Sequence, residues 1–106
     1  MKYTVATYTV KPEMIKAVKR AIAEFVDEVR KHEPRTLYVV LREEGQHTFV
    51  HWMWFENQAA ERRHALARYS KRFAHKLSPT FVGKAALSEF RLLACAKTQW
   101  RLEPNR

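Results

Sequence analysis

The chain has 106 residues, with 20 Lys and Arg against 11 Asp and Glu, and therefore a formal net charge of +9 when histidines are neutral. This length permits one domain, and 46% hydrophobic residues suffice for a packed core, which excludes a wholly disordered chain. The only glycines, Gly45 and Gly83, lie outside any GxGxxG or GxxxxGK pattern, which excludes nucleotide-binding loops of those types. With one cysteine, Cys95, and no secretion signal or apolar membrane span in the sequence, we expect a soluble cytoplasmic protein.

The first third of the chain predicts a strand followed by a helix. Residues 3–10 are rich in Thr, Val and Tyr, and this strand ends before Pro12. From residue 14 onward, apolar residues recur at steps of three and four, which predicts a helix with one buried face. Its apolar residues are Ile15, Val18, Ile22, Phe25, Val26 and Val29. The helix ends at Glu33, because a residue that precedes proline avoids helical backbone.

The remaining elements complete a known topology. Residues 36–42 and 47–55 predict two strands of a β-hairpin around a turn at residues 43–46. Residues 56–77 predict a second helix, and residues 86–96 predict a last strand. The order β-α-β-β-α-β predicts the ferredoxin-like α+β fold, a four-stranded antiparallel sheet with two helices on one face.

The strand at residues 47–55 is apolar on both of its faces. One face carries Phe49, Met53 and Phe55 with His47 and His51, and the other carries Val50, Trp52 and Trp54 with Thr48. Two helices cover only one face of such a sheet, and a chain of this length has no further element for the other. We therefore predict a homodimer with its sheets face to face, built from a domain of residues 1–96 and a tail of residues 97–106 that carries Trp100.

The element order, the paired apolar faces and the segment from Trp54 to His64 resemble the antibiotic biosynthesis monooxygenase superfamily of dimeric α+β-barrel proteins. In that family the third strand ends with an aromatic residue, followed by an acidic and a small polar residue. An alanine then lies near the helix start, and a His or Trp follows nine residues after the aromatic. The matching residues are Phe55, Glu56, Asn57, Ala60 and His64, with Phe73 matching a later aromatic. The resemblance covers about residues 2–96.

Some members of this family oxygenate electron-rich phenols to quinones without metal or flavin, and others bind and cleave haem. The resemblance therefore implies a cofactor-independent monooxygenase that acts on a small aromatic hydroxyl compound, with no metal. It implies His64 or His75 as the catalytic base, and as substrate contacts it implies Trp52, Trp54, Phe55, Phe73, Asn57 and His51. The alternative is a non-catalytic or haem-binding and haem-degrading dimer that holds a flat hydrophobic anion. Against haem cleavage, the first strand lacks the Asn of those relatives, and His64 stands where they have a Trp.

Helical periodicity conflicts with a catalytic role for either histidine. In one straight helix over residues 57–77, His64 and His75 face solvent. The residues that then face the sheet are Ala59, Leu66, Tyr69, Phe73 and Leu77. A catalytic role requires a break near residues 68–70, where the chain has neither Pro nor Gly, and both alternatives stay open. We expect His51 to be a hydrogen-bonded interior residue more often than a base, and it lies about 13 Å from His47, too far for a shared metal ion.

The second helical segment also holds most of the excess positive charge. Its basic residues are Arg62, Arg63, Arg68, Lys71, Arg72 and Lys76, against Glu61 alone. Such a band can bind phosphates or steer an anionic ligand, but a solvated helix face is the interpretation we favour. We do not expect nucleic-acid binding, because the sequence has no RNP-like motif, GXXG loop or zinc knuckle.

Overall fold

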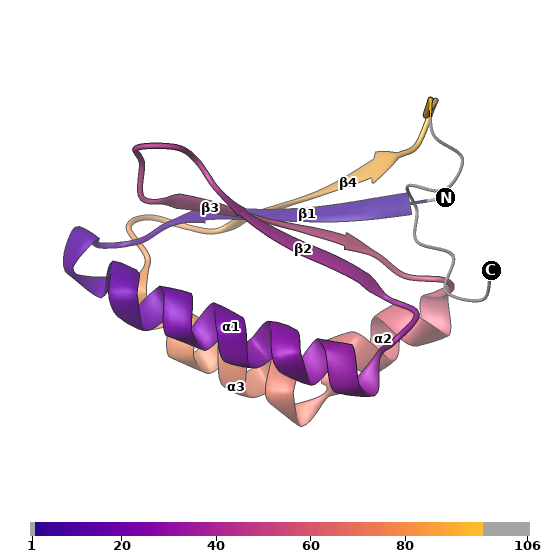
Figure 1. Cartoon of the computed structure of the whole chain (residues 1–106), viewed down its shortest axis with the longest axis horizontal. Helices are drawn as coiled ribbons and strands as arrows, with labels where there is room; N and C mark the ends of the chain where they lie inside the picture. The colour runs from indigo at the N-terminus through magenta and orange to yellow at the C-terminus, as the bar shows by residue number, and fades with distance from the viewer. Residues whose placement is uncertain (1, 97–106) are drawn as a thin grey trace.

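The computed structural model describes residues 2–96, which form one antiparallel sheet and a layer of helices. The strands are β1 (Lys2–Thr9), β2 (Leu37–Arg42), β3 (Thr48–Trp54) and β4 (Ala86–Arg91), in the sheet order β2-β3-β1-β4. The helices are α1 (Ile15–His32), α2 (Gln58–Leu66) and α3 (Arg68–Leu77), with short 3-10 turns at Pro12–Met14 and Ser78–Thr80. All three helices lie on one face of the sheet (Figure 1), so the predicted ferredoxin-like α+β architecture is confirmed.

Burial along β3 separates the two faces of the sheet. Phe49, His51 and Met53 point toward the helices and are buried, whereas Val50, Trp52 and Trp54 alternate with them and remain partly exposed. This alternation follows from the period of two in a strand. The division of β3 into two apolar faces is thus the one that the sequence predicts.

The hydrophobic core lies between the helices and the sheet. Its buried residues are Tyr8, Val10, Val18, Ala21, Phe25, Val29, Phe49, Phe73 and Leu77. At its centre Phe25 of α1 stacks on Phe73 of α3, with ring centroids 4.2 Å apart and planes 2° from parallel. This contact joins the two helices, which run side by side beneath the sheet (Figure 1).

The segment predicted as one helix is two helices. Ala67 separates α2 from α3 with an extended backbone, φ −63° and ψ 145°. His64 is consequently buried, at 9% exposure, whereas Leu66 is 60% exposed. Of the two alternatives left open by the sequence, the structure therefore has the one with a break, at Ala67, one residue before the expected 68–70. In α3, Phe73 and Leu77 are buried as the periodicity predicts.

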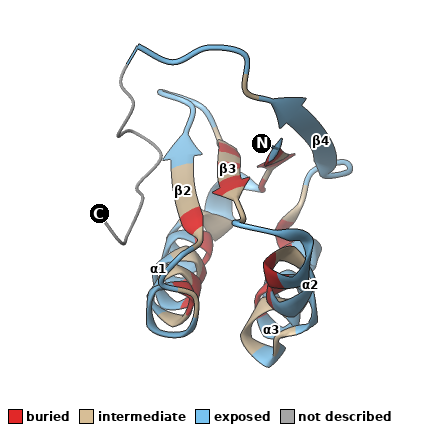
Figure 2. Ribbon diagram, turned by 90° about the vertical axis from the view of Figure 1, so that its right-hand side faces the viewer, coloured by how far each residue is buried: buried red, intermediate tan, exposed pale blue. Residues whose placement is uncertain are grey.

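Strand β4 differs from the other strands in its exposure. It ends at Arg91, earlier than the predicted residue 96, and every one of its residues is exposed (Figure 2). The tail with Trp100 lies outside the described residues. Within residues 2–96, no helix has the length and apolar character that crossing a bilayer requires.

Candidate functional site

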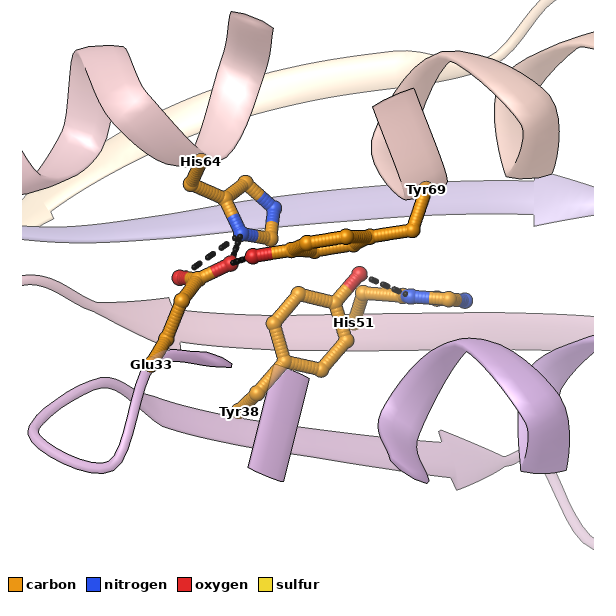
Figure 3. A network of polar contacts seen from close by, with 5 residues as sticks. All are labelled: Glu33, Tyr38, His51, His64 and Tyr69. Carbon is orange, nitrogen blue, oxygen red and sulfur yellow. Dashed lines mark hydrogen bonds and ion pairs between the residues drawn. The ribbon is translucent and has the colours of Figure 1, made fainter. Parts of the chain in front are cut away.

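A carboxylate at the end of α1 gathers two side chains from the other helices. Glu33 is the C-cap residue of α1, and its Oε2 lies 2.9 Å from Nδ1 of His64 in α2. The hydroxyl of Tyr69, the second residue of α3, donates a hydrogen bond to the same oxygen (Figure 3). The side chains of Glu33 and His64 are only 9% and 11% exposed. The break at Ala67 is what allows the two helices to present both groups to one carboxylate.

The hydrogen bonds account for the charge of Glu33 and for the tautomer of a neutral His64 ring. Burial alone would raise the pKa of Glu33, but the hydrogen bonds from His64 and Tyr69 hold it below its usual range. An ionised carboxylate only accepts hydrogen bonds, so Nδ1 of His64 carries a proton, and Nε2 is the basic nitrogen of the neutral ring. No residue within 2–96 makes a hydrogen bond to that Nε2. The pair thus has the form of an oriented general base.

A second polar chain lies beside the first. His51 of β3 is 2% exposed, and its Nε2 and Nδ1 each lie 2.7 Å from a tyrosyl oxygen, of Tyr8 and Tyr38 respectively. Burial lowers the pKa of His51 to about 4, so its ring is neutral at neutral pH. The ring of Tyr38 lies 5.5 Å from that of His64 and brings the two polar groups together (Figure 3).

Aromatic rings enclose His64 on several sides. Its ring centroid lies 5.1 Å from that of Phe55 and 5.7 Å from that of Phe25. Phe73 stacks on Phe25 and lies 5.8 Å from His51. The structure therefore brings together four residues that the resemblance implied, namely His51, Phe55, His64 and Phe73.

The other implied residues lie elsewhere. Trp54 and Asn57 line a cavity of about 410 Å³ at the junction of β3 and α2, which Phe55 also borders. Oδ1 of Asn57 accepts a hydrogen bond from the Ala60 amide at 2.8 Å, so this side chain caps α2. Trp52 faces away from the helices, and His75 is an exposed residue of α3 outside the cluster.

Sequence reasoning missed Glu33 and Tyr69. The sequence identifies Glu33 only as the end of a helix, and it identifies Tyr69 only as one residue of an apolar helix face. One clue was present, because a carboxylate at a helix C-terminus faces the negative end of the helix dipole and needs a compensating partner. The sequence predicts that His51 is hydrogen-bonded in the interior, but it does not identify Tyr8 and Tyr38 as the partners.

One of the two cavities that Glu33 borders also contacts Tyr69. It measures about 230 Å³ and is bordered by Glu33, Tyr69 and the basic residues Arg35 and Arg63 among others. Arg35 donates to Glu56 across this opening at 3.0 Å. No group of three or more His, Cys, Asp or Glu side chains in the described part of the chain is placed to hold a metal ion.

These features can be set beside known proteins. The family model described as antibiotic biosynthesis monooxygenase matches residues 1–76. The chain belongs to this family. No protein among the curated sequences matches the chain.

Solved structures of the family share the fold. The structure of an antibiotic biosynthesis monooxygenase superimposes with a TM-score of 0.80 at 21% identity, over 89% of this chain and 100% of that one. A Caulobacter crescentus protein, provisionally assigned to the same family, gives 0.80 at 19% identity, over 88% and 90% of the two chains. A conserved Methanosarcina mazei protein gives 0.77 at 20% identity, over 85% and 90%. At these identities the likeness establishes the fold of this antibiotic biosynthesis monooxygenase family member, and its chemistry must be argued from its own residues.

Proposed function

We propose that this protein is a cofactor-independent monooxygenase that oxidises a small aromatic hydroxyl compound, with His64 as the catalytic base. The observation that carries the proposal is the buried Glu33–His64 pair, held at 2.9 Å and enclosed by aromatic rings. Family membership supports a monooxygenase-type reaction. His75 is left out because its exposed side chain touches none of this cluster.

The chemistry needs only the substrate, dioxygen and a base. Nε2 of His64 takes the hydroxyl proton of the substrate, and Glu33 stabilises the resulting imidazolium. The phenolate carbon para to its oxygen then bonds to dioxygen and reduces it to a peroxide. Loss of the proton from that carbon and cleavage of the O–O bond leave a quinone and release water. One phenol and one dioxygen thus give one quinone and one water, so no external reductant is required.

The surroundings of His64 suit this reaction. A phenolate is a stronger reductant when it is held away from water, and aromatic walls such as Phe25 and Phe55 exclude water while they contact a flat substrate. Tyr69 holds the second hydrogen bond to Glu33 and so fixes the carboxylate that orients His64. Tyr69 and Glu33 are thus positioning residues, whereas His64 is the catalytic residue.

Oxygen uptake with phenols that carry hydrogen on the carbon para to the hydroxyl, such as 1-naphthol, tests the proposal after metal removal. His64→Ala is expected to lower the rate by about 10² or more, which is the usual contribution of a general base. His75→Ala is the matched control, because it removes an exposed histidine from the neighbouring helix, and it should leave the rate unchanged. Absence of turnover with every such compound, or an unchanged rate in His64→Ala, would overturn the proposal.

The proposed working unit is a homodimer in which a second copy covers the outer face of the sheet. That face bears a mostly apolar groove of about 560 Å³, bordered by Val5, Trp52 and Phe90, and Phe90 is 56% exposed. Sedimentation should give twice the chain mass, and Trp52→Glu should halve it, because a buried carboxylate at the interface would lack a partner. A monomer at micromolar concentration contradicts the dimer.

Haem binding is not proposed for this chain. The Phe25–Phe73 stack, with ring centroids 4.2 Å apart, lies in the layer between the sheet and the helices. A planar macrocycle would have to separate that stack. A haem titration that gives a Soret shift would contradict this view.

A further inference from the structure

The hydrogen-bonded series Tyr8–His51–Tyr38 has no part in the mechanism above, yet His51 at its centre is buried and hydrogen-bonded at both ring nitrogens. Both ring nitrogens of His51 lie 2.7 Å from a tyrosyl oxygen. A neutral imidazole has one N–H donor and one acceptor nitrogen. One tyrosine therefore donates its hydroxyl hydrogen to the ring, and the other accepts the ring N–H.

Two directions are possible, and they differ in which hydroxyl hydrogen is left over. If Tyr38 donates to Nδ1 of His51, then Nε2–H of the ring donates to the Tyr8 oxygen, and the hydroxyl hydrogen of Tyr8 has no acceptor among these three residues. If Tyr8 donates to Nε2 of His51, then Nδ1–H of the ring donates to the Tyr38 oxygen, and the hydroxyl hydrogen of Tyr38 is the one without an acceptor among these three residues. A buried donor without an acceptor is costly, so the surroundings of the two ends decide between them.

The Tyr8 end is apolar. Its ring lies 4.9 Å from that of Phe81 and 5.7 Å from that of Phe49, and within residues 2–96 its hydroxyl bonds only to His51. A hydroxyl hydrogen that pointed away from His51 at this buried end would therefore have no acceptor among the described residues.

The Tyr38 end faces the candidate site. Its ring lies 5.5 Å from that of His64 (Figure 3), and the negative charge of Glu33 acts on its hydroxyl. Burial is the largest cause of the raised pKa of Tyr38, followed by the electrostatic effects of Tyr8 and then of Glu33. A carboxylate attracts the positive end of an O–H dipole, so the free hydrogen is stabilised at Tyr38 rather than at Tyr8.

We propose that the chain runs from Tyr8 through His51 to Tyr38, and that Tyr38 donates its hydroxyl hydrogen to the ligand oxygen that His64 deprotonates. The ligand role of Tyr38 rests on the proposed function, whereas the direction of the hydrogen bonds from Tyr8 to Tyr38 does not. A donor fixed in advance stabilises the phenolate as its charge develops, without reorganising at that moment. Tyr38 is then a second ligand-contacting residue, and Tyr8 and His51 are positioning residues that aim it.

The tautomer of His51 tests the direction of the chain without any ligand. Long-range ¹H–¹⁵N correlation spectra of the whole protein at neutral pH should show the proton on Nδ1 and a hydrogen-bonded acceptor at Nε2. If the proton is found on Nε2, the hydrogen bonds run from Tyr38 to Tyr8, and the proposal is overturned.

Binding of 4-nitrophenol tests the role of Tyr38, because the absorbance of its phenolate reports both affinity and ionisation without turnover. Tyr38→Phe should weaken binding of the phenolate about tenfold or more, as expected for a lost hydrogen bond to a charged group. Tyr3→Phe is the control, since it removes a hydroxyl from a buried tyrosine of β1 that borders the outer face of the sheet, and it should change affinity less than twofold.

The outcomes separate this inference from the proposed function. If 4-nitrophenol binds and Tyr38→Phe binds it equally well, Tyr38 has no ligand role and the inference fails while the proposed function stands. If 4-nitrophenol does not bind the unaltered protein, the proposed function and the ligand role of Tyr38 fail together. Should Tyr38→Phe not fold, the His51 tautomer of the unaltered protein still decides the direction of the chain.

Discussion

Acid should destabilise this protein through His51 before it does so through Glu33. Burial lowers the pKa of His51 to about 4 in the folded protein, against 6.5 for an ordinary histidine. As the pH falls below 6.5, the unfolded chain binds a proton there that the folded protein does not yet bind. The stability that neutral His51 contributes is therefore complete above pH 6.5 and is lost progressively toward pH 4.

The size of this loss follows from the two pKa values. Each unit of difference corresponds to 1.36 kcal/mol, so a difference of 2.5 units predicts a loss of about 3 kcal/mol between pH 7 and pH 4. The pKa of Glu33 is lowered too, but an acidic group with a lowered pKa loses its contribution only below the ordinary range of carboxylates. The interval from pH 6.5 to about 5 therefore reports mainly on His51.

Urea unfolding at a series of pH values measures the effect. His51→Gln retains an amide donor and acceptor for the two tyrosines but does not titrate, so subtracting its profile from that of the unaltered protein isolates His51. His75→Gln is the control, because an exposed histidine should leave the profile unchanged. A difference profile that is flat between pH 7 and pH 4, or that shows increasing stability on acidification, would refute the argument.

Two further predictions concern the helices. Phe73→Ala removes the ring stacked at 4.2 Å on Phe25 and should lower the free energy of unfolding by about 3–5 kcal/mol, whereas Leu66→Ala should change it by less than about 0.5 kcal/mol. Similar costs for the two variants would mean that α2 and α3 share one buried stripe after all. Asn57→Ala removes the cap of α2 and should cost about 1 kcal/mol in urea unfolding, while Asn57→Asp, which keeps the accepting oxygen, should cost less. An equal loss in both variants would contradict the capping role.

The sheet was predictable because its signals are local. Alternation in the segment around Phe49, His51 and Met53 requires only that a strand have one side against a core, and the structure buries those three residues. The helix stripe that includes Phe25 is equally local, and α1 carries it as expected. The fold therefore followed from periodicity and from the residues that interrupt it, such as Pro34.

The candidate site was not predictable in the same way, because its central contact is tertiary. Residues 64 and 69 are five positions apart, which in one straight helix places their side chains about 140° around the axis from each other. Both nevertheless reach the carboxylate of Glu33, which lies 31 and 36 positions earlier in the chain. Only a break between them permits this arrangement.

Nothing local produces the break. Ala67 is the best helix former of all residue types, yet it adopts an extended backbone, and neither Pro nor Gly stands near it. The extended backbone of Ala67 is therefore stabilised by tertiary interactions, namely the burial of His64 and the two hydrogen bonds to Glu33. Glu33→Leu should consequently release α2 as well as the histidine, because the carboxylate that orients the proposed base is also the group that holds the two helices at their angle.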